Sequence, residues 1–233
     1  MTRHPTSRSS RSAHIAASRR ESKELTRQAL LRAALKLLSR HSFDSISLRE
    51  VTRQAGVSPT AFYRHFDDME ELGLVLVEES FGQLRQMVRD ARSDPLLGAN
   101  AIRGSVEVVA AHAIDHRDHL RFVARERYGG VRRLRRAIRR EMQLFADELA
   151  VDLAELEMVR SWTLDDRRMV AGLVAETLVH MTFEGLDATD TERDALIGRT
   201  EAQLRLIWLG VPYFRSVDDS AEAEGTAGDA PVG

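Results

Sequence analysis

The chain has 233 residues, of which 43% are hydrophobic and 30% are charged, with a formal net charge of -2 and no cysteine. This composition allows a sizeable buried core and excludes disulfides, cysteine-ligated metal sites and a thiolate nucleophile. No apolar run approaches the roughly 18 to 20 residues that a membrane-spanning helix needs, so we expect a cytoplasmic protein that does not enter a membrane.

The charge is divided unevenly along the chain. Residues 1–65 hold 13 basic and 4 acidic side chains, a difference of +9, and the remaining residues hold 21 and 32, a difference of -11. A basic region favours an anionic partner such as nucleic acid, and an acidic remainder keeps the protein in solution.

Residues 1–22 are rich in arginine and serine and contain almost no large apolar side chain. Such a segment cannot bury enough surface to order itself, so we expect a disordered basic arm that meets phosphate. An organellar transit peptide has a similar composition, but no cleavage-like boundary separates this segment from the helical pattern that follows.

Helical periodicity begins in residues 23–40, where apolar residues recur at intervals of three and four: Leu30, Ala33, Ala34, Leu37 and Leu38. Ser47 then precedes Glu50 by the three-residue spacing of a capping box, which predicts the start of a second helix. That helix should end at Gly56, because glycine adopts a positive φ without steric cost.

Ser58 and Pro59 fit the N-cap and first position of a short third helix that closes near Phe66. Asp67 and Glu70 repeat the capping spacing and predict a long fourth helix. Further helical patterns cover residues 99–115, 116–127, 132–153, 164–184 and 191–209.

The fold class is therefore predicted to be all-α, because the chain has only 5 prolines and no sustained two-residue alternation. We expect four segments: a disordered basic arm (1–22), a three-helix DNA-binding domain with a helix-turn-helix (23–66), a larger helical ligand-binding and dimerisation domain (67–215) and a disordered acidic tail (216–233).

Helix, glycine turn and helix in residues 47–66 form a pattern typical of DNA-reading proteins. The third helix is too short to be stable in water alone, so packing must hold it. Phe62 and Phe66, one turn apart, are the expected anchors, which leaves four side chains for a DNA groove: Thr60, Tyr63, Arg64 and His65. The helix starts at Ser47 and Ser58 present free N–H groups, which suit phosphates.

This stretch, above all its ending Phe62-Tyr63-x-His65-Phe66, resembles the DNA-binding segment of TetR-family transcriptional regulators. The resemblance implies an all-helical homodimer that binds a palindromic operator in double-stranded DNA and is switched by a small molecule in its larger domain. It also implies phosphate contacts from Ser47, Tyr63 and His65, and base contacts from Arg49, Thr60 and Arg64. Met69 departs from the pattern, because many members carry a phosphate-binding lysine there.

Two longer segments, residues 62–73 and 122–130 with the arginine-rich helix after them, are similar to the FabR and DesT repressors of unsaturated fatty-acid synthesis. The similarity covers roughly residues 24–153. It implies that the effector is long-chain acyl-CoA, with its acyl tail inside the helical domain, and that the regulated genes serve fatty-acid desaturation or lipid metabolism.

The densest basic cluster outside the DNA-binding domain lies in residues 125–140. Arginines suit the phosphates of a CoA group, and those we assign to that role are Arg125, Arg132, Arg136 and Arg140. The alternative is a solvated helix surface paired with nearby acidic residues.

A hydrocarbon tunnel is the second part of the expected ligand site. The residues assigned to it are Phe122, Trp162, Leu178 and Met181, and ordinary core packing explains each of them equally. The last two predicted helices carry wide apolar faces and are the expected dimer interface.

His112, His116 and His119 have helical spacing that admits a metal site, but the charged residues between them indicate a solvated helix junction instead. The sequence contains no nucleophile elbow, no His-Glu-x-x-His and no glycine-rich phosphate loop, so we expect neither an enzyme nor a cofactor.

The predicted function is thus a ligand-responsive repressor. Three alternatives remain open: a regulator that responds to a drug or another hydrophobic molecule, an effector-free architectural DNA-binding protein, and a histidine-metal hydrolase.

Overall fold

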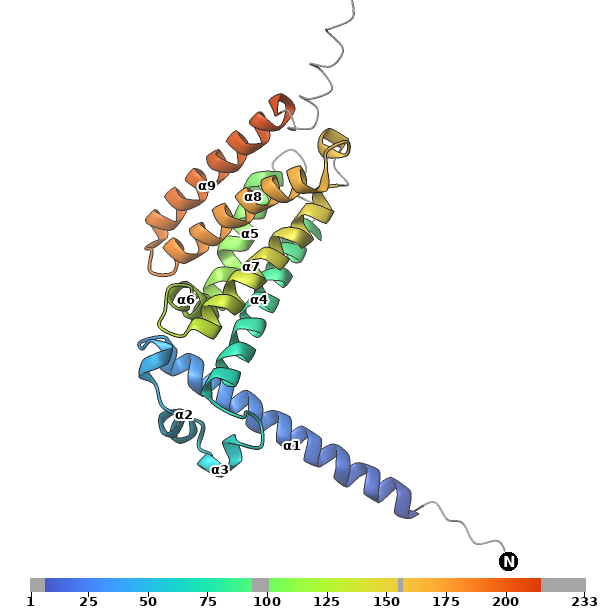
Figure 1. Ribbon diagram of the computed structural model, residues 1–233, viewed down its shortest axis with the longest axis vertical. Coiled ribbons are helices and arrows are strands. Elements are labelled where there is room, and N and C mark those ends of the chain that lie inside the picture. Colours follow the sequence, from blue (N-terminus) through green and yellow to red (C-terminus); the bar gives the residue numbers. More distant parts are fainter. Residues whose placement is uncertain (1–6, 94–100, 155–156, 215–233) are drawn as a thin grey trace, which may run out of the picture.

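The computed structural model describes residues 7–93, 101–154 and 157–214 (Figure 1). Within these ranges all regular structure is helical, which confirms the predicted all-α class. The elements are α1 (Ser7–Leu38), η1 (Phe43–Ser45), α2 (Leu48–Ala55), α3 (Pro59–Phe62), α4 (Met69–Ser93), α5 (Ala101–Asp115), α6 (Arg117–Glu126), α7 (Arg132–Leu153), η3 (Glu157–Val159), α8 (Leu164–Gly185), α9 (Asp190–Gly210) and η4 (Val211–Tyr213). The predicted acidic tail lies outside the described residues.

Most helices begin and end close to their predicted limits. α7 has the predicted range, α8 ends one residue later, and α9 extends one residue further at each end. The short η1, η3 and η4 helices were not predicted, because a three-residue turn carries no periodicity. No helix in the described part of the chain is both long and apolar enough to span a membrane.

The first helix is longer than expected. α1 begins at Ser7 and not near Lys23, so residues 7–22 of the predicted disordered arm are helical. Alanine and arginine in this stretch have a high intrinsic helix propensity, which apolar periodicity does not detect. In Figure 1 this N-terminal half of α1 projects away from the rest of the molecule.

The boundary between α3 and α4 also differs in detail. α3 is four residues long, and a hydrogen bond of 3.1 Å from Phe66 N–H to the Phe62 carbonyl continues the turn beyond it. α4 begins at Met69, capped by Asp68, whose Oδ1 accepts a 2.7 Å hydrogen bond from Glu71 N–H. The predicted cap at Asp67 was therefore wrong by one residue, because both adjacent aspartates have a glutamate three residues later.

The molecule has two parts joined by α4 (Figure 1). The C-terminal half of α1 packs with α2 and α3 into a three-helix head, in which Leu30, Val51 and Phe62 are fully buried. The helical body consists of the remaining helices, with α4 against α5 and α7, and with α8 between α7 and α9.

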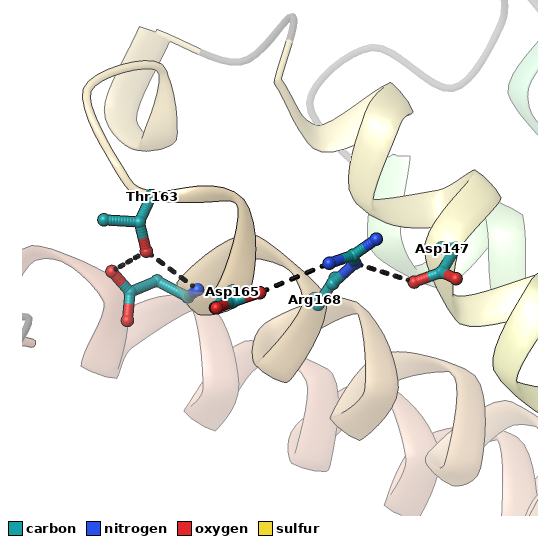
Figure 2. Close-up of polar contacts among 5 residues, drawn as sticks. Asp147, Thr163, Asp165 and Arg168 are labelled. Carbon is teal, nitrogen blue, oxygen red and sulfur yellow. Dashed lines mark hydrogen bonds and ion pairs between the residues drawn. The ribbon is translucent and has the colours of Figure 1, made fainter.

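Polar contacts fix the start of α8 against α7 (Figure 2). Thr163 is the N-cap, because its Oγ1 accepts a 3.2 Å hydrogen bond from Asp166 N–H. Arg168 bridges Asp147 of α7 at 2.9 Å and Asp165 of α8 at 3.3 Å. This ion pair ties α7 to α8 close to the Trp162–Phe214 contact, where the ring centroids are 5.1 Å apart.

Candidate DNA interface and ligand cleft

The cap of α2 has the predicted geometry. Ser47 Oγ accepts a hydrogen bond from Glu50 N–H at 3.3 Å, Glu50 Oε2 accepts one from Ser47 N–H at 2.8 Å, and Gly56 has φ of 70°. The Ser47 hydroxyl also lies 2.7 Å from the Glu50 carboxylate, and these bonds hold the pKa of Glu50 below its ordinary value. The backbone N–H and the hydroxyl of Ser47 therefore both donate to the Glu50 carboxylate. A phosphate at this helix start would have to compete with that carboxylate for the same donors.

The recognition segment, which we define as α3 and the turn after it up to Phe66, is anchored from one side. Phe62 and Phe66 are buried with ring centroids 5.5 Å apart, while the Tyr63 side chain remains 61% exposed. The other predicted DNA contacts of the head that lie on the surface are Ser47, Arg49, Ser58, Thr60 and Arg64. The segment can therefore present polar side chains to DNA while its aromatic anchors stay in the core.

His65 is half-buried beside the N-terminal helix. Burial lowers its pKa, and the nearby positive charges of Lys23 and Arg27 lower it further. In the DNA-free protein the lowered pKa favours the neutral ring, which can still donate one N–H to a phosphate. Met69 packs against the hydrophobic core, so it cannot replace the lysine that other regulators carry there.

The head is held to the body by the last two residues of α6. Arg125 Nη1 donates hydrogen bonds to the Leu38 carbonyl at 2.9 Å and the His41 carbonyl at 2.7 Å, at the end of α1. Arg125 was predicted to bind CoA. The structure instead uses its guanidinium to satisfy carbonyls that a helix C-terminus leaves free.

Glu126 makes the second connection between body and head. Its side chain is 1% exposed, and its Oε1 accepts a 2.9 Å hydrogen bond from Phe43 N–H in η1. Within the described residues, Oε2 has no hydrogen-bond partner. Burial raises the pKa of this carboxyl group, and the Phe43 N–H partly opposes that shift.

Glu126→Gln should change how stability depends on pH. The pKa of Glu126 in the folded protein lies above the ordinary 4.5. In the pH window between these two pKa values, the native protein binds a proton more readily than the unfolded chain does. Wild-type stability therefore falls as pH rises through the window, by up to about 1.4 kcal/mol per pH unit. Glutamine does not titrate, and its side-chain oxygen can still accept the Phe43 N–H. The free energy of unfolding of Glu126→Gln, relative to that of the wild type, should therefore increase with pH. Urea unfolding from pH 4 to 8 measures this difference, and parallel profiles would contradict it.

A cleft of about 630 Å³ lies between α7 and α8, within the size range of small-molecule sites. Its polar end contains the half-buried Arg127 and Arg135 and the exposed Arg139. Arg127 lies over the rings of Tyr128 and Phe183, at 5.0 and 6.0 Å from their centroids. The rest of the lining is mostly small or apolar: Ile138, Met142, Gln143, Ala146, Gly172, Ala175 and Glu176.

The arginines of α7 therefore divide by helix face. Those at the cleft are Arg135 and Arg139, whereas Arg132, Arg136 and Arg140, which we predicted to hold CoA phosphates, are exposed on other sides of the helix. Arg133 pairs with Glu70 of α4 at 3.0 Å. The i, i+4 spacing of Arg135 and Arg139 was visible in the sequence, but only the packing of α7 shows which face lines a cleft.

The residues predicted to form a hydrocarbon tunnel do not line this cleft. Phe122 is 1% exposed and packs against Phe43, with ring centroids 6.4 Å apart. Trp162 contacts Phe214, and Leu178 packs against the main core. Met181 lines a separate cavity of about 20 Å³, room for roughly one water molecule. The alternative of ordinary core packing describes Phe122 better than a ligand contact does.

The three histidines do not converge. His119 Nδ1 lies 3.0 Å from Ser80 Oγ, and His112 Nδ1 lies 2.9 Å from the Val108 carbonyl. Because the Ser80 hydroxyl donates to the Leu76 carbonyl at 2.7 Å, His119 must donate to Ser80 and carries its proton on Nδ1. Among the described residues, no three potential ligands gather closely enough for a metal ion.

Residues 30–74 match the family model described as bacterial regulatory proteins, tetR family. The fold is similar to that of a transcriptional regulator from Pseudomonas aeruginosa PAO1, with a TM-score of 0.63, 19% identity and coverage of 81% of this chain and 93% of that one. It is also similar to FadR of Bacillus halodurans, with a TM-score of 0.59, 14% identity and coverage of 78% and 94%. For FadR of Bacillus subtilis in complex with stearoyl-CoA, the TM-score is 0.57 with 17% identity and coverage of 77% and 96%.

Residues 30–74 thus match the TetR-type DNA-binding domain, and the chain as a whole shares the fold of these solved transcriptional regulators. The helical body is part of this shared fold.

Proposed function

We propose that the protein is a homodimeric repressor of lipid-metabolism genes, related to the FabR and DesT regulators, that binds a palindromic operator in the cytoplasm and responds to long-chain acyl-CoA. The observation that carries the DNA-binding part is the outward presentation of Tyr63 and Arg64 on a segment anchored by buried Phe62. A groove-reading helix needs this combination of a fixed backbone and exposed polar side chains.

Arg64→Ala should weaken operator binding by about 1–3 kcal/mol and relax the sequence preference, because arginine reads guanine in the major groove. Fluorescence anisotropy with the operator and with base-substituted operators measures both effects. Arg160→Ala is a matched control, because Arg160 is also exposed but lies in the body ahead of α8. Equal weakening on all DNA would make Arg64 a phosphate contact.

The acyl-CoA part rests on the cleft between α7 and α8. It joins an arginine-rich end to a small and apolar remainder, which suits an amphipathic anion. Each methylene buried from an acyl chain contributes roughly 0.8 kcal/mol, so a modest number of them gives strong binding. The stearoyl-CoA complex of a protein with a similar fold supports the same class of ligand.

The test is a titration of DNA from the protein's own upstream region, with stearoyl-CoA and oleoyl-CoA added separately. A change in operator affinity with either, and none with free coenzyme A, supports acyl-CoA sensing. A response to uncharged hydrophobic molecules alone would favour the drug-responsive alternative. Binding without any defined palindrome would favour an architectural protein.

Dimerisation is proposed through α8 and α9, which lie side by side on one side of the body (Figure 1). Large apolar side chains on these helices are exposed in the single chain: Leu164, Met169, Leu173, Leu206 and Leu209. A dimer could hold its two recognition segments about 34–36 Å apart, the spacing of successive major grooves. A ligand that prefers another separation would then change operator affinity.

Leu173→Glu should weaken this dimer by about 2 kcal/mol or more, because a charge would be buried in an apolar interface. Leu173 is 51% exposed in the single chain, so the subunit itself should fold normally. Sedimentation velocity over a concentration series measures the shift toward monomer. Leu25→Glu, 63% exposed on α1, is the control and should leave the assembly unchanged.

A further inference from the structure

The turn formed by Gly129 and Gly130 lies between the ligand cleft and the DNA-binding head. On the cleft side, Arg135 Nη1 donates hydrogen bonds to the carbonyl of Gly129 and, at 2.9 Å, to that of Gly130. Arg135 is also one of the residues that line the cleft. The Arg135 guanidinium group thus lines the cleft and at the same time holds this turn by hydrogen bonds.

On the head side, the turn touches both acidic groups near η1. A Cβ added at Gly129 would overlap the Glu126 carboxylate, and one added at Gly130 would lie 2.6 Å from Asp44 Oδ2. Glu126 in turn holds the Phe43 N–H at 2.9 Å. A movement of the turn would therefore displace the buried Glu126 carboxylate, whereas the exposed Asp44 carboxylate can rotate aside.

The chemistry of the cleft gives Arg135 a second possible partner. Three arginines and one glutamate make its polar lining positive, and carboxylate or phosphate groups bind guanidinium more strongly than neutral carbonyls do. An anionic group placed between Arg135 and Arg139 would therefore compete with the Gly129 and Gly130 carbonyls for the same N–H donors.

We propose that Arg135 transmits occupancy of the α7–α8 cleft to the DNA-binding head by exchanging the Gly129 and Gly130 carbonyls for the anionic group of an amphipathic ligand. The freed turn then loosens Glu126, whose carboxylate holds the Phe43 N–H of η1 ahead of α2. The ligand class rests on the proposed function, whereas the link from Arg135 through the turn to η1 rests on the contacts alone. Arg135 is in this sense a positioning residue for the head.

Arg135→Ala and Arg139→Ala form a matched pair that separates the two roles. Both remove a cleft arginine, but only Arg135 supports the turn, and Arg139 has no hydrogen bond or ion pair within the described residues. Both variants should bind stearoyl-CoA more weakly by calorimetry. Without ligand, only Arg135→Ala should shift operator affinity, in the direction that stearoyl-CoA shifts the wild type.

Coupling gives a second readout. Allosteric coupling factors are typically about 5- to 150-fold, and the ligand must change DNA affinity by the same factor as DNA changes ligand affinity. For Arg139→Ala at saturating stearoyl-CoA this factor should remain that of the wild type. For Arg135→Ala it should fall toward one, and an unchanged factor would overturn the proposal.

Gly129→Ala tests the turn without touching the cleft lining. The added Cβ would meet the buried Glu126 carboxylate, so operator affinity should shift from that of the wild type although no residue of the cleft is changed. If neither acyl-CoA affects the wild type, the effector class is wrong. The link from Arg135 through the turn to η1 is then tested by operator affinity measured without ligand. Equal operator affinities of Arg135→Ala and Arg139→Ala would overturn it.

Discussion

Phe62→Ala is expected to abolish sequence-specific DNA binding and to lower the free energy of unfolding by about 3–5 kcal/mol. Phe62 is 0% exposed and contacts Phe66 and Tyr63, with ring centroids 5.5 and 5.7 Å away. α3 has only four residues, far fewer than a helix needs to persist without packing. Removing the ring leaves a cavity and frees the segment that presents Arg64.

Urea unfolding and anisotropy with the operator measure the two effects together. Tyr63→Ala is the control for stability, because the Tyr63 side chain, next to Phe62, is 61% exposed. Its removal should leave the free energy of unfolding nearly unchanged and should remove one proposed phosphate contact. A Phe62→Ala protein that reads its operator like the wild type would show that the recognition segment does not depend on this anchor.

Phe43→Ala is expected to cost about 3–5 kcal/mol and, in addition, to uncouple the head from the body. The Phe43 ring is 4% exposed and lies at the meeting point of η1, α4, α6 and α7. A Cβ at Gly73 would lie 2.7 Å from this ring and 2.9 Å from Leu134, so α4 needs glycine there to approach both.

Differential scanning calorimetry is the measurement for Phe43→Ala. Wild type should unfold in one transition, whereas the variant should show separate transitions, or a van't Hoff enthalpy below the calorimetric one. Ile46→Val is the control, because it removes one methylene from a neighbouring buried side chain and should cost only about 0.5–1.5 kcal/mol. A single, merely shifted transition in Phe43→Ala would show that head and body remain coupled without the ring.

Local signals in the sequence were sufficient for most helices. Caps, glycine at the end of α2 and apolar periodicity depend on residues within a few positions of one another, so they can be interpreted without a structure. They failed where local signals were ambiguous or weak. Asp67 and Asp68 offer the same cap one residue apart, and the N-terminal half of α1 is helical without an apolar stripe.

The recognition segment was the part of the site most accessible from sequence. Its anchors and its exposed side chains lie within one turn of each other, so the 3.6-residue period alone separates Phe62 from Arg64. The ligand site was not accessible in this way. Arg135 and Arg139 belong to a cluster of arginines that covers a broad side of α7, and periodicity cannot say which part of that side lies at the cleft with α8.

The sequence by itself determined the all-helical class, the cap of α2 and the exposed side of the recognition segment, because each depends on neighbours along the chain. Only the tertiary structure decided that Arg125 and Glu126 hold the head, through partners more than 80 residues away, and that the Arg135 face of α7 lines the cleft. Contacts between distant residues depend on how helices pack, and helix packing is set by the shapes of many side chains at once.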